Sequence, residues 1–149
     1  MPTIDRSLAG TTAFGEVVFA QVDYLPQSGA TYIVKTPSPG WLSRVAERCA
    51  YLFSMPAGWD GYAAPKVDPD LIQRVWDFAQ AAARIVTAEP SLVPTVGGGV
   101  AVEWHVRGIE LEIELTSTGV LVLLEDETGE VEGPLRDHEA RVAAALQRL

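Results

Sequence analysis

The stretch VAVEWHVRGIELEIEL, residues 100–115, decides the fold of this chain. Apolar residues recur at every second position on both sides of Arg107-Gly108, which is typical of two half-buried β-strands. If Arg107-Gly108 is a two-residue turn, each apolar residue faces another apolar residue. The resulting pairs are Val106–Ile109, Trp104–Leu111, Val102–Ile113 and Val100–Leu115. The pattern therefore predicts an antiparallel hairpin with one buried face.

Two further regions are predicted to form strands. Residues 120–124 are apolar on both faces, so we expect a third strand that completes a meander over residues 100–125 and is better covered than its neighbours. Residues 14–24 and 31–36 are rich in β-branched and aromatic residues and predict an N-terminal β-hairpin. Residues 1–12 show no pattern, and we expect them to be flexible.

Three helices are predicted around this sheet. Ser38-Pro39 marks one start, with an apolar stripe that ends before Pro56, and Asp68-Pro69 marks a second, with a stripe that reaches Ala88. Pro134 opens the last helix. The order β-β-α-α-β-β-β-α has no βαβ alternation. It therefore predicts one α+β domain over residues 1–149, with an antiparallel sheet and helices mainly on one face.

The composition fits a globular protein of the cytoplasm. The chain has 149 residues, 48% of them hydrophobic, which is enough to bury a core in one domain. It shows no secretory signal and no apolar run of the roughly 18 residues that cross a membrane. Cys49 is the one cysteine, so no disulfide can form within the chain. We therefore expect a cytoplasmic location and no membrane contact.

The net charge of −9 is concentrated in one quarter of the chain. Residues 103–139 hold eleven acids against Arg107 and Arg136, a balance of −9, whereas residues 1–102 hold nine acids against seven basic residues, a balance of −2. The last ten residues return +2 through Arg141 and Arg148. Such a field repels phosphate backbones, which argues against direct nucleic-acid binding by this segment.

The hairpin register also places a set of polar side chains on the second face. His105 lies opposite Glu110, and Glu103 lies opposite Glu112, where like charges destabilise an antiparallel pair. A counter-charge is therefore expected there: an arginine such as Arg136 or Arg141, a metal ion or a basic partner. The candidate partner-binding residues are Glu103, His105, Glu110, Glu112 and Glu114.

No catalytic residue set, cofactor site or metal site is predicted. Cys49 and His138 fall on apolar helix sides and are interpreted as packing residues. The Gly97-Gly98-Gly99 run leads into a strand and lacks the lysine of a phosphate loop. Neither Lys35 nor Lys66 lies in the acidic strands, so a nuclease core of carboxylates and lysine is not indicated.

A second motif, Gly58-Trp59-Asp60-Gly61-Tyr62, lies between the first two predicted helices. The glycines could supply positive φ and Asp60 an Asx turn, with Trp59 and Tyr62 folding back as hydrogen-bonded plugs over the helix ends. We expect this loop to meet Trp104 in the core. The alternative is an exposed aromatic patch for protein recognition, and the two interpretations predict opposite burial for Trp59.

This loop, together with Pro65, Pro94-Thr95 and the later Gly98-Gly99-Val100…Glu103-Trp104, resembles a family of small uncharacterised bacterial proteins. That family carries a Gly-Trp-Asp-Gly-Tyr loop and a later Gly-Gly-(Ile/Val)…Glu-Trp strand. The resemblance covers residues 40–125 and implies kinship without a known activity. Its members often carry an acid before the glycine pair. Gly97 stands there in this chain, which argues against a carboxylate site at that turn.

Three functions follow from these patterns. The first hypothesis is a non-enzymatic protein that engages a basic protein partner through the acidic face, in the manner of an antitoxin, immunity protein or small chaperone. The second is a self-assembling structural module that forms homo-oligomers through the N-terminal hairpin. The third, and least favoured, is a metal-dependent hydrolase using Glu103, His105, Glu110 and Glu112.

Overall fold

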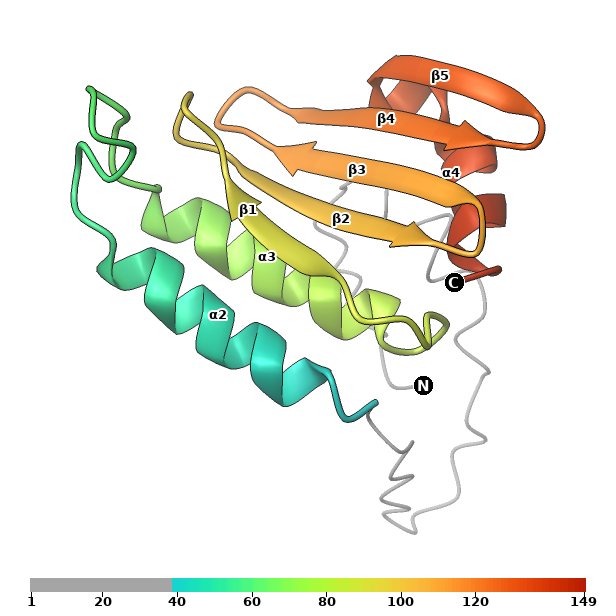
Figure 1. Cartoon of the computed structure of the whole chain (residues 1–149), viewed down its shortest axis with the longest axis horizontal. Coiled ribbons are helices and arrows are strands. Elements are labelled where there is room, and N and C mark those ends of the chain that lie inside the picture. The colour runs from blue at the N-terminus through green and yellow to red at the C-terminus, as the bar shows by residue number, and fades with distance from the viewer. Residues whose placement is uncertain (1–38) are drawn as a thin grey trace, which may run out of the picture.

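The alternating stretch lies within a five-stranded antiparallel sheet whose strands follow chain order, β1-β2-β3-β4-β5 (Figure 1). The computed structural model describes residues 39–149. Its strands are β1 (Ser91–Pro94), β2 (Val100–Val106), β3 (Ile109–Leu115), β4 (Val120–Asp126) and β5 (Gly129–Pro134). Its helices are α2 (Leu42–Ser54), α3 (Pro69–Ala82), the 3₁₀ turn η2 (Leu135–Asp137) and α4 (Glu139–Leu146). The predicted α+β class is confirmed.

The predicted N-terminal hairpin and the flexible segment before it lie outside the described residues. Self-assembly through that hairpin therefore stays a prediction.

The register of the central hairpin is confirmed. Trp104 pairs with Leu111, Val106 with Ile109, and the other two apolar pairs are likewise as predicted. Arg107 and Gly108 both have positive φ, at 56° and 72°, which is the geometry of a two-residue hairpin turn that follows the strand twist. Ile109, Leu111 and Ile113 have no exposed surface on the inner face, whereas Val106, the partner of Ile109 at the turn end, is 39% exposed.

Two strands escaped prediction because they form the edges of the sheet. Residues 91–94 offer only Leu92 and Val93 between prolines, and residues 129–134 (GEVEGP) contain two glycines and two glutamates, which are poor strand formers. Each becomes a strand by pairing with its better-patterned neighbour, β1 with β2 and β5 with β4. Pro134 therefore ends β5 and is also the N-cap of the 3₁₀ turn η2, so the predicted helix begins as this short turn and α4 itself starts only at Glu139.

Strand β4 corrects another expectation. It runs on to Asp126, and only Glu127 and Thr128 turn the chain before β5. The prediction that this strand is better covered than its neighbours is wrong, because Leu121 is 45% exposed on the outer face. The apolar residues of β4 therefore lie on one buried face and one partly exposed face.

Each of the first two described helices differs from its prediction at one limit, α2 at its start and α3 at its end. Helix α2 starts at Leu42, after a turn in which Leu42 N–H donates to the Pro39 carbonyl. The Asp68-Pro69 start of α3 is confirmed, with Asp68 capping the Asp70 N–H at 2.8 Å. However, α3 ends at Ala82 and not at Ala88.

Tertiary contacts explain this early end. The Ala88 carbonyl accepts a hydrogen bond from Trp104 Nε1 at 3.0 Å, and the Ala88 N–H donates to the Leu149 carbonyl at 2.9 Å. A continuous helix would carry Ala88 away from both partners. The chain therefore leaves the helix through tight turns over residues 83–85.

The core lies between the helices and the inner face of the sheet. Helix α2 packs on α3 and β1, α3 on β2 and β3, and α4 on β3. Figure 1 shows α2 and α3 side by side, with α4 at the other end of the sheet. Residues from all three helices and from four strands, β1 to β4, join one buried apolar cluster. This covering leaves the opposite face of the sheet for other roles.

Candidate functional site

The outward side chains of strands β2 to β5 form three rows across the sheet, because paired residues of neighbouring strands point to the same side. The rows are His105–Glu110–Glu125–Glu130, Glu103–Glu112–Leu123–Glu132 and Ala101–Glu114–Leu121–Pro134. We call this surface the outer face. It brings together all five residues that the sequence proposed for partner binding, and adds three glutamates from β4 and β5.

The outer face carries carboxylates without basic neighbours. Its seven glutamates are Glu103, Glu110, Glu112, Glu114, Glu125, Glu130 and Glu132. In the part of the chain that the structure describes, no lysine or arginine occupies a position in these rows, and His105 is the one group there that can become positive. The negative charge is therefore not balanced within this face.

His105 lies between two carboxylates. Its Nδ1 contacts Glu110, and its Nε2 lies 3.3 Å from Glu103 Oε2. Both ring nitrogens can donate only in the imidazolium form, so the hydrogen bonds to Glu110 and then Glu103 raise the pKa of His105 above its ordinary value. The histidine thus acts as a partial counter-charge for the first two rows.

Glu112 is only weakly compensated by His105, whose attraction is the smallest influence on the pKa of Glu112. It is partly buried and lies directly opposite Glu103. Desolvation, followed by repulsion from Glu103 and Glu114, raises the pKa of Glu112. Glu112 and Glu103 therefore repel one another at the centre of the outer face.

Neither arginine suggested by the sequence relieves it. Arg141 binds Asp126 at 2.9 Å, and Arg148 reaches the same carboxylate at 3.4 Å. Asp126 points to the inner face, so these pairs tie α4 to the sheet and leave the outer face untouched. Arg136 lies 3.8 Å from its neighbour Asp137. Neither Arg136 nor Arg141 therefore supplies the counter-charge, and a metal ion or a basic partner stays a prediction.

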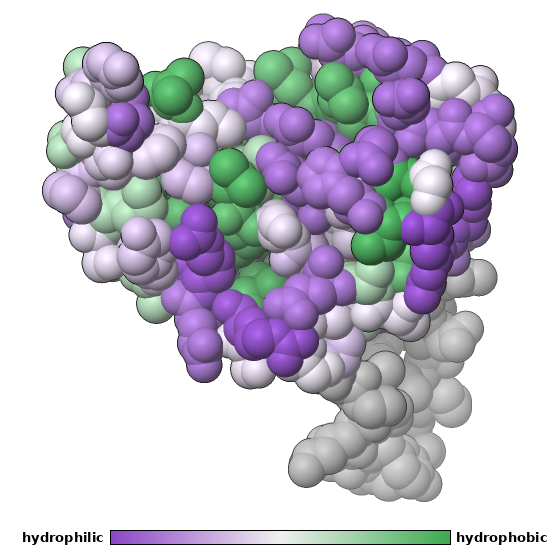
Figure 2. All heavy atoms as spheres, in the orientation of Figure 1, coloured by the Kyte–Doolittle hydropathy of each residue, from purple (hydrophilic) through white to green (hydrophobic). Residues whose placement is uncertain are grey.

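The outer face also has an apolar corner, which the sequence analysis missed. Leu121 is 45% exposed, Leu123 is partly exposed on the same strand, and Val93 of β1 is 38% exposed. Figure 2 shows hydrophilic residues over much of this side of the molecule, interrupted by separate hydrophobic patches. The sequence signal for this corner is the presence of apolar residues on both faces of residues 120–124, a pattern that also predicts deeper burial.

The geometry does not favour a metal centre. Glu103 and Glu110 contact opposite nitrogens of the His105 ring, so the three groups do not converge on one point. Within residues 39–149, no group of three or more His, Cys, Asp or Glu side chains is arranged to hold a metal ion. The hydrolase hypothesis has no support from this arrangement.

The Gly-Trp-Asp-Gly-Tyr loop is ordered by its aspartate. Asp60 Oδ1 accepts from the backbone N–H groups of Tyr62, at 3.0 Å, and Ala64, at 3.2 Å, which is the predicted Asx-type turn. Gly58 and Gly61 have the expected positive φ, at 75° and 82°. The loop is thus a built structure whose shape depends on Asp60.

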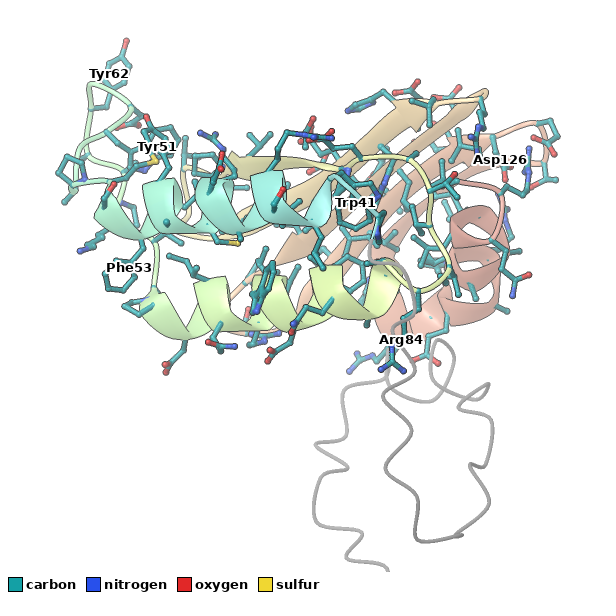
Figure 3. All side chains as sticks on the ribbon, turned by 90° about the horizontal axis from the view of Figure 1, so that it is seen from below. Trp41, Tyr51, Phe53, Tyr62, Arg84 and Asp126 are labelled. Carbon is teal, nitrogen blue, oxygen red and sulfur yellow. The ribbon has the colours of Figure 1, made fainter. Side chains whose placement is uncertain are left out.

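The two aromatic residues of the loop have different environments. Trp59 is partly buried and packs against the core, although its Nε1 has no hydrogen-bond partner among the described residues. Tyr62 is 89% exposed and projects from the loop (Figure 3). The prediction of two hydrogen-bonded plugs is therefore wrong: Gly61 reverses the chain, and Asp60 holds the Tyr62 backbone so that its side chain points outward.

Pro65, which follows the loop, contacts the later glycine turn. A methyl group added to Gly98 would lie 3.0 Å from Pro65 Cγ, so the two segments are in contact. At Gly99 an added methyl would lie 2.8 Å from the Leu115 carbonyl, which leaves room only for glycine. Trp104 itself is buried on the inner face, where its ring contacts Phe78 edge-on.

Comparison with known proteins adds no family to this geometry. None of the helices in the described part of the chain is long and apolar enough to span a membrane. The chain matches no family model, no curated protein and no solved structure.

Proposed function

We propose that this protein is a non-catalytic binding protein that engages a basic protein partner through its outer face, in the manner of an antitoxin, immunity protein or small chaperone. The observation that carries the proposal is the set of seven glutamates in register on one face without a lysine or arginine among them. Potentials of one sign over such a surface attract a partner of opposite charge and repel nucleic acid.

The unfavourable interaction at the centre of this face supports the proposal. Glu103 and Glu112 lie opposite one another, and partial burial keeps their repulsion from being fully screened. A partner lysine or arginine placed between them would remove this repulsion and gain a charge-assisted hydrogen bond. Binding would thus be favoured by relief of an existing cost as well as by new contacts.

The apolar corner narrows the kind of partner. Leu121 offers exposed apolar surface beside Glu114, and Val93 offers more at the β1 end of the same row, so the partner surface combines cations with at least one apolar side chain. Protein interfaces combine apolar and charged surface, and complementary charges mainly set the association rate and its salt dependence.

The experiment is affinity capture with the full chain, followed by binding measurements on the captured protein at increasing salt. The test variant is the double charge reversal Glu110→Lys/Glu112→Lys. We expect affinity to fall by about tenfold or more and the salt dependence to flatten, because two central attractions become repulsions.

A matched control is Glu47→Lys/Asp77→Lys, which changes net charge equally at exposed positions of α2 and α3. It should leave affinity within about twofold, since it lies away from the outer face. Equal losses in both double variants would mean that only net charge matters. A captured partner that is acidic, or whose binding ignores salt, would refute the proposal.

A further inference from the structure

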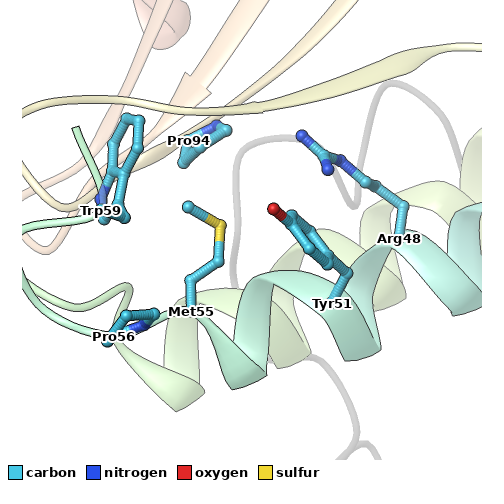
Figure 4. Close-up of a pocket in the computed structure, with 6 residues that line it drawn as sticks. All are labelled: Arg48, Tyr51, Met55, Pro56, Trp59 and Pro94. Atoms are coloured by element: carbon cyan, nitrogen blue, oxygen red, sulfur yellow. The ribbon is translucent and has the colours of Figure 1, made fainter. Parts of the chain in front are cut away.

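A hollow of about 450 Å³ lies away from the outer face, between α2, the loop that follows it and the end of β1. Its lining residues are Arg48, Tyr51, Met55, Pro56, Trp59 and Pro94. Figure 4 shows the Arg48 guanidinium, the Tyr51 hydroxyl and the Met55 side chain directed toward a common space, with Trp59 and Pro94 on its far side. The hollow is therefore lined both by Trp59 of the Gly-Trp-Asp-Gly-Tyr loop and by residues of α2.

The apolar walls of this hollow are held in place. Met55 is buried, and Trp59 packs against the core from a loop that Asp60 orders. Pro94 belongs to β1, which is paired with β2. A ligand would therefore meet a surface that is already formed, which reduces the entropy lost on binding.

The polar part of the hollow is dominated by one cation. Arg48 Nε donates to the Leu92 carbonyl at 3.0 Å, and the guanidinium lies 4.8 Å from the centre of the Tyr51 ring. These contacts fix the position of the guanidinium, which is directed toward the hollow (Figure 4). Among residues 39–149, the ion pairs of the arginines involve Arg44, Arg136, Arg141 and Arg148, and Arg48 has none.

We propose that this hollow binds a carboxylate that is attached to an aromatic or branched apolar group. The Arg48 guanidinium is held in position but has no ion-pair partner among residues 39–149. It matches a carboxylate in charge and in its bidentate geometry, and the Tyr51 hydroxyl supplies a further donor. The apolar group then lies against Met55, Pro94 and the Trp59 ring. Phosphate is a poorer match, because Arg48 is the one cation among the lining residues of the hollow. Lys66 lies over the Phe53 ring and does not line the hollow.

The test uses N-acetyl-L-tryptophan and its neutral amide as probes, with calorimetry for affinity and the Trp59 indole N–H resonance for location. We expect the acid to bind at least about tenfold more tightly than the amide and to shift the Trp59 resonance. The variant Arg48→Gln should abolish this preference. Arg84→Gln, at an exposed arginine outside the hollow, should keep it.

Tyr51→Leu provides a second variant, since this exposed side chain can be removed without loss of the core. It should weaken binding of the acid, because a donor and a cation–π partner are lost. Equal binding of acid and amide, no binding of the acid, or the same loss in Arg84→Gln as in Arg48→Gln would overturn the proposal. None of these outcomes depends on the outer face, so the proposed function is tested separately.

The same chemistry is offered by a free acid and by the C-terminus of a peptide. The peptide Gly-Gly-Gly-Gly-Trp with a free carboxylate, compared with N-acetyl-L-tryptophan, distinguishes them. Tighter binding of the peptide identifies a protein or peptide C-terminus as the ligand, and weaker or equal binding identifies a small acid. If the amidated peptide binds as well as the free one, the carboxylate has no role and the proposal is wrong.

Discussion

The two faces of strand β3 are built from alternating residues of one seven-residue segment, yet they differ in burial and in charge. The inner residues Ile109, Leu111 and Ile113 are fully buried, and every one meets an apolar partner across the strand. The outer residues Glu110, Glu112 and Glu114 face glutamates, a histidine and leucines. The inner face supplies stability, whereas the outer face retains a repulsion that stability alone would remove. The difference teaches that strand alternation separates the residues that stabilise the core from the charged residues that our proposal assigns to partner binding.

The largest expected effect comes from comparing two leucines on opposite faces of neighbouring strands. Leu111→Ala should lower the free energy of unfolding by about 3 kcal/mol, because it opens a cavity beside Trp104. Leu121→Ala should cost less than about 1 kcal/mol, because 45% of that side chain is already exposed. Urea unfolding of both variants measures the difference. Similar losses would show that the outer face is covered in solution.

A smaller effect of opposite sign is expected at the centre of the outer face. Glu112→Gln should raise the free energy of unfolding by about 0.5 kcal/mol at pH 7, because it removes the repulsion with Glu103 and Glu114. The pKa of Glu112 is raised in the folded protein, so its charge costs stability once the pH exceeds the unfolded value.

Urea unfolding at pH 7 and at pH 4 checks this assignment. The stabilisation by Glu112→Gln should shrink at pH 4, where the carboxyl group is largely protonated in both states. A destabilised Glu112→Gln variant at pH 7 would contradict the charge argument and would imply that the carboxylate makes a favourable contact.

The smallest effect concerns His105. Its pKa lies above the ordinary value of 6.5, so its contribution to stability is fully present below that pH and is lost as the pH rises through the folded-state pKa. The side chain is 53% exposed, and solvent screening limits the contribution to about 0.3 kcal/mol. Titration of the His105 ring by NMR gives the folded-state pKa directly.

His105→Gln should remove this part of the pH dependence, which begins above pH 6.5 and ends once the pH has passed the raised folded-state pKa. A His105 pKa at or below 6.5 would mean that Glu103 and Glu110 do not hold the ring in solution.

Much of the fold could be predicted from particular residues. The alternation from Val100 to Leu115 set the hairpin register, and with it the gathering of Glu103, His105, Glu110, Glu112 and Glu114 on one face. Asp68-Pro69 set the start of α3, and Asp60 set the turn of its loop. These features depend on neighbours in the chain or on a period of two, so they can be read locally.

Other features of the candidate sites could not be predicted in this way. The sequence offered Arg141 as one possible counter-charge for the outer glutamates. In the structure Arg141 binds the inward-facing Asp126 instead. The outward position of Tyr62 follows from the path of the whole loop, and composition alone favoured burial. The hollow around Arg48 joins residues that are separated by up to 46 positions in the chain, from Arg48 to Pro94. No local sequence pattern predicts that such distant residues line one hollow.

The sequence by itself determined the α+β class, the central hairpin with its register, and the concentration of acid on one of its faces. Only the tertiary structure decided where α3 ends, that β1 and β5 are strands, and that the outer face has an apolar corner. The physical reason is the range of the interactions. Strand alternation and helix caps act between near neighbours. In contrast, the Trp104–Ala88 and Ala88–Leu149 hydrogen bonds, and the pairing of weak edge strands, exist only after distant segments have packed together.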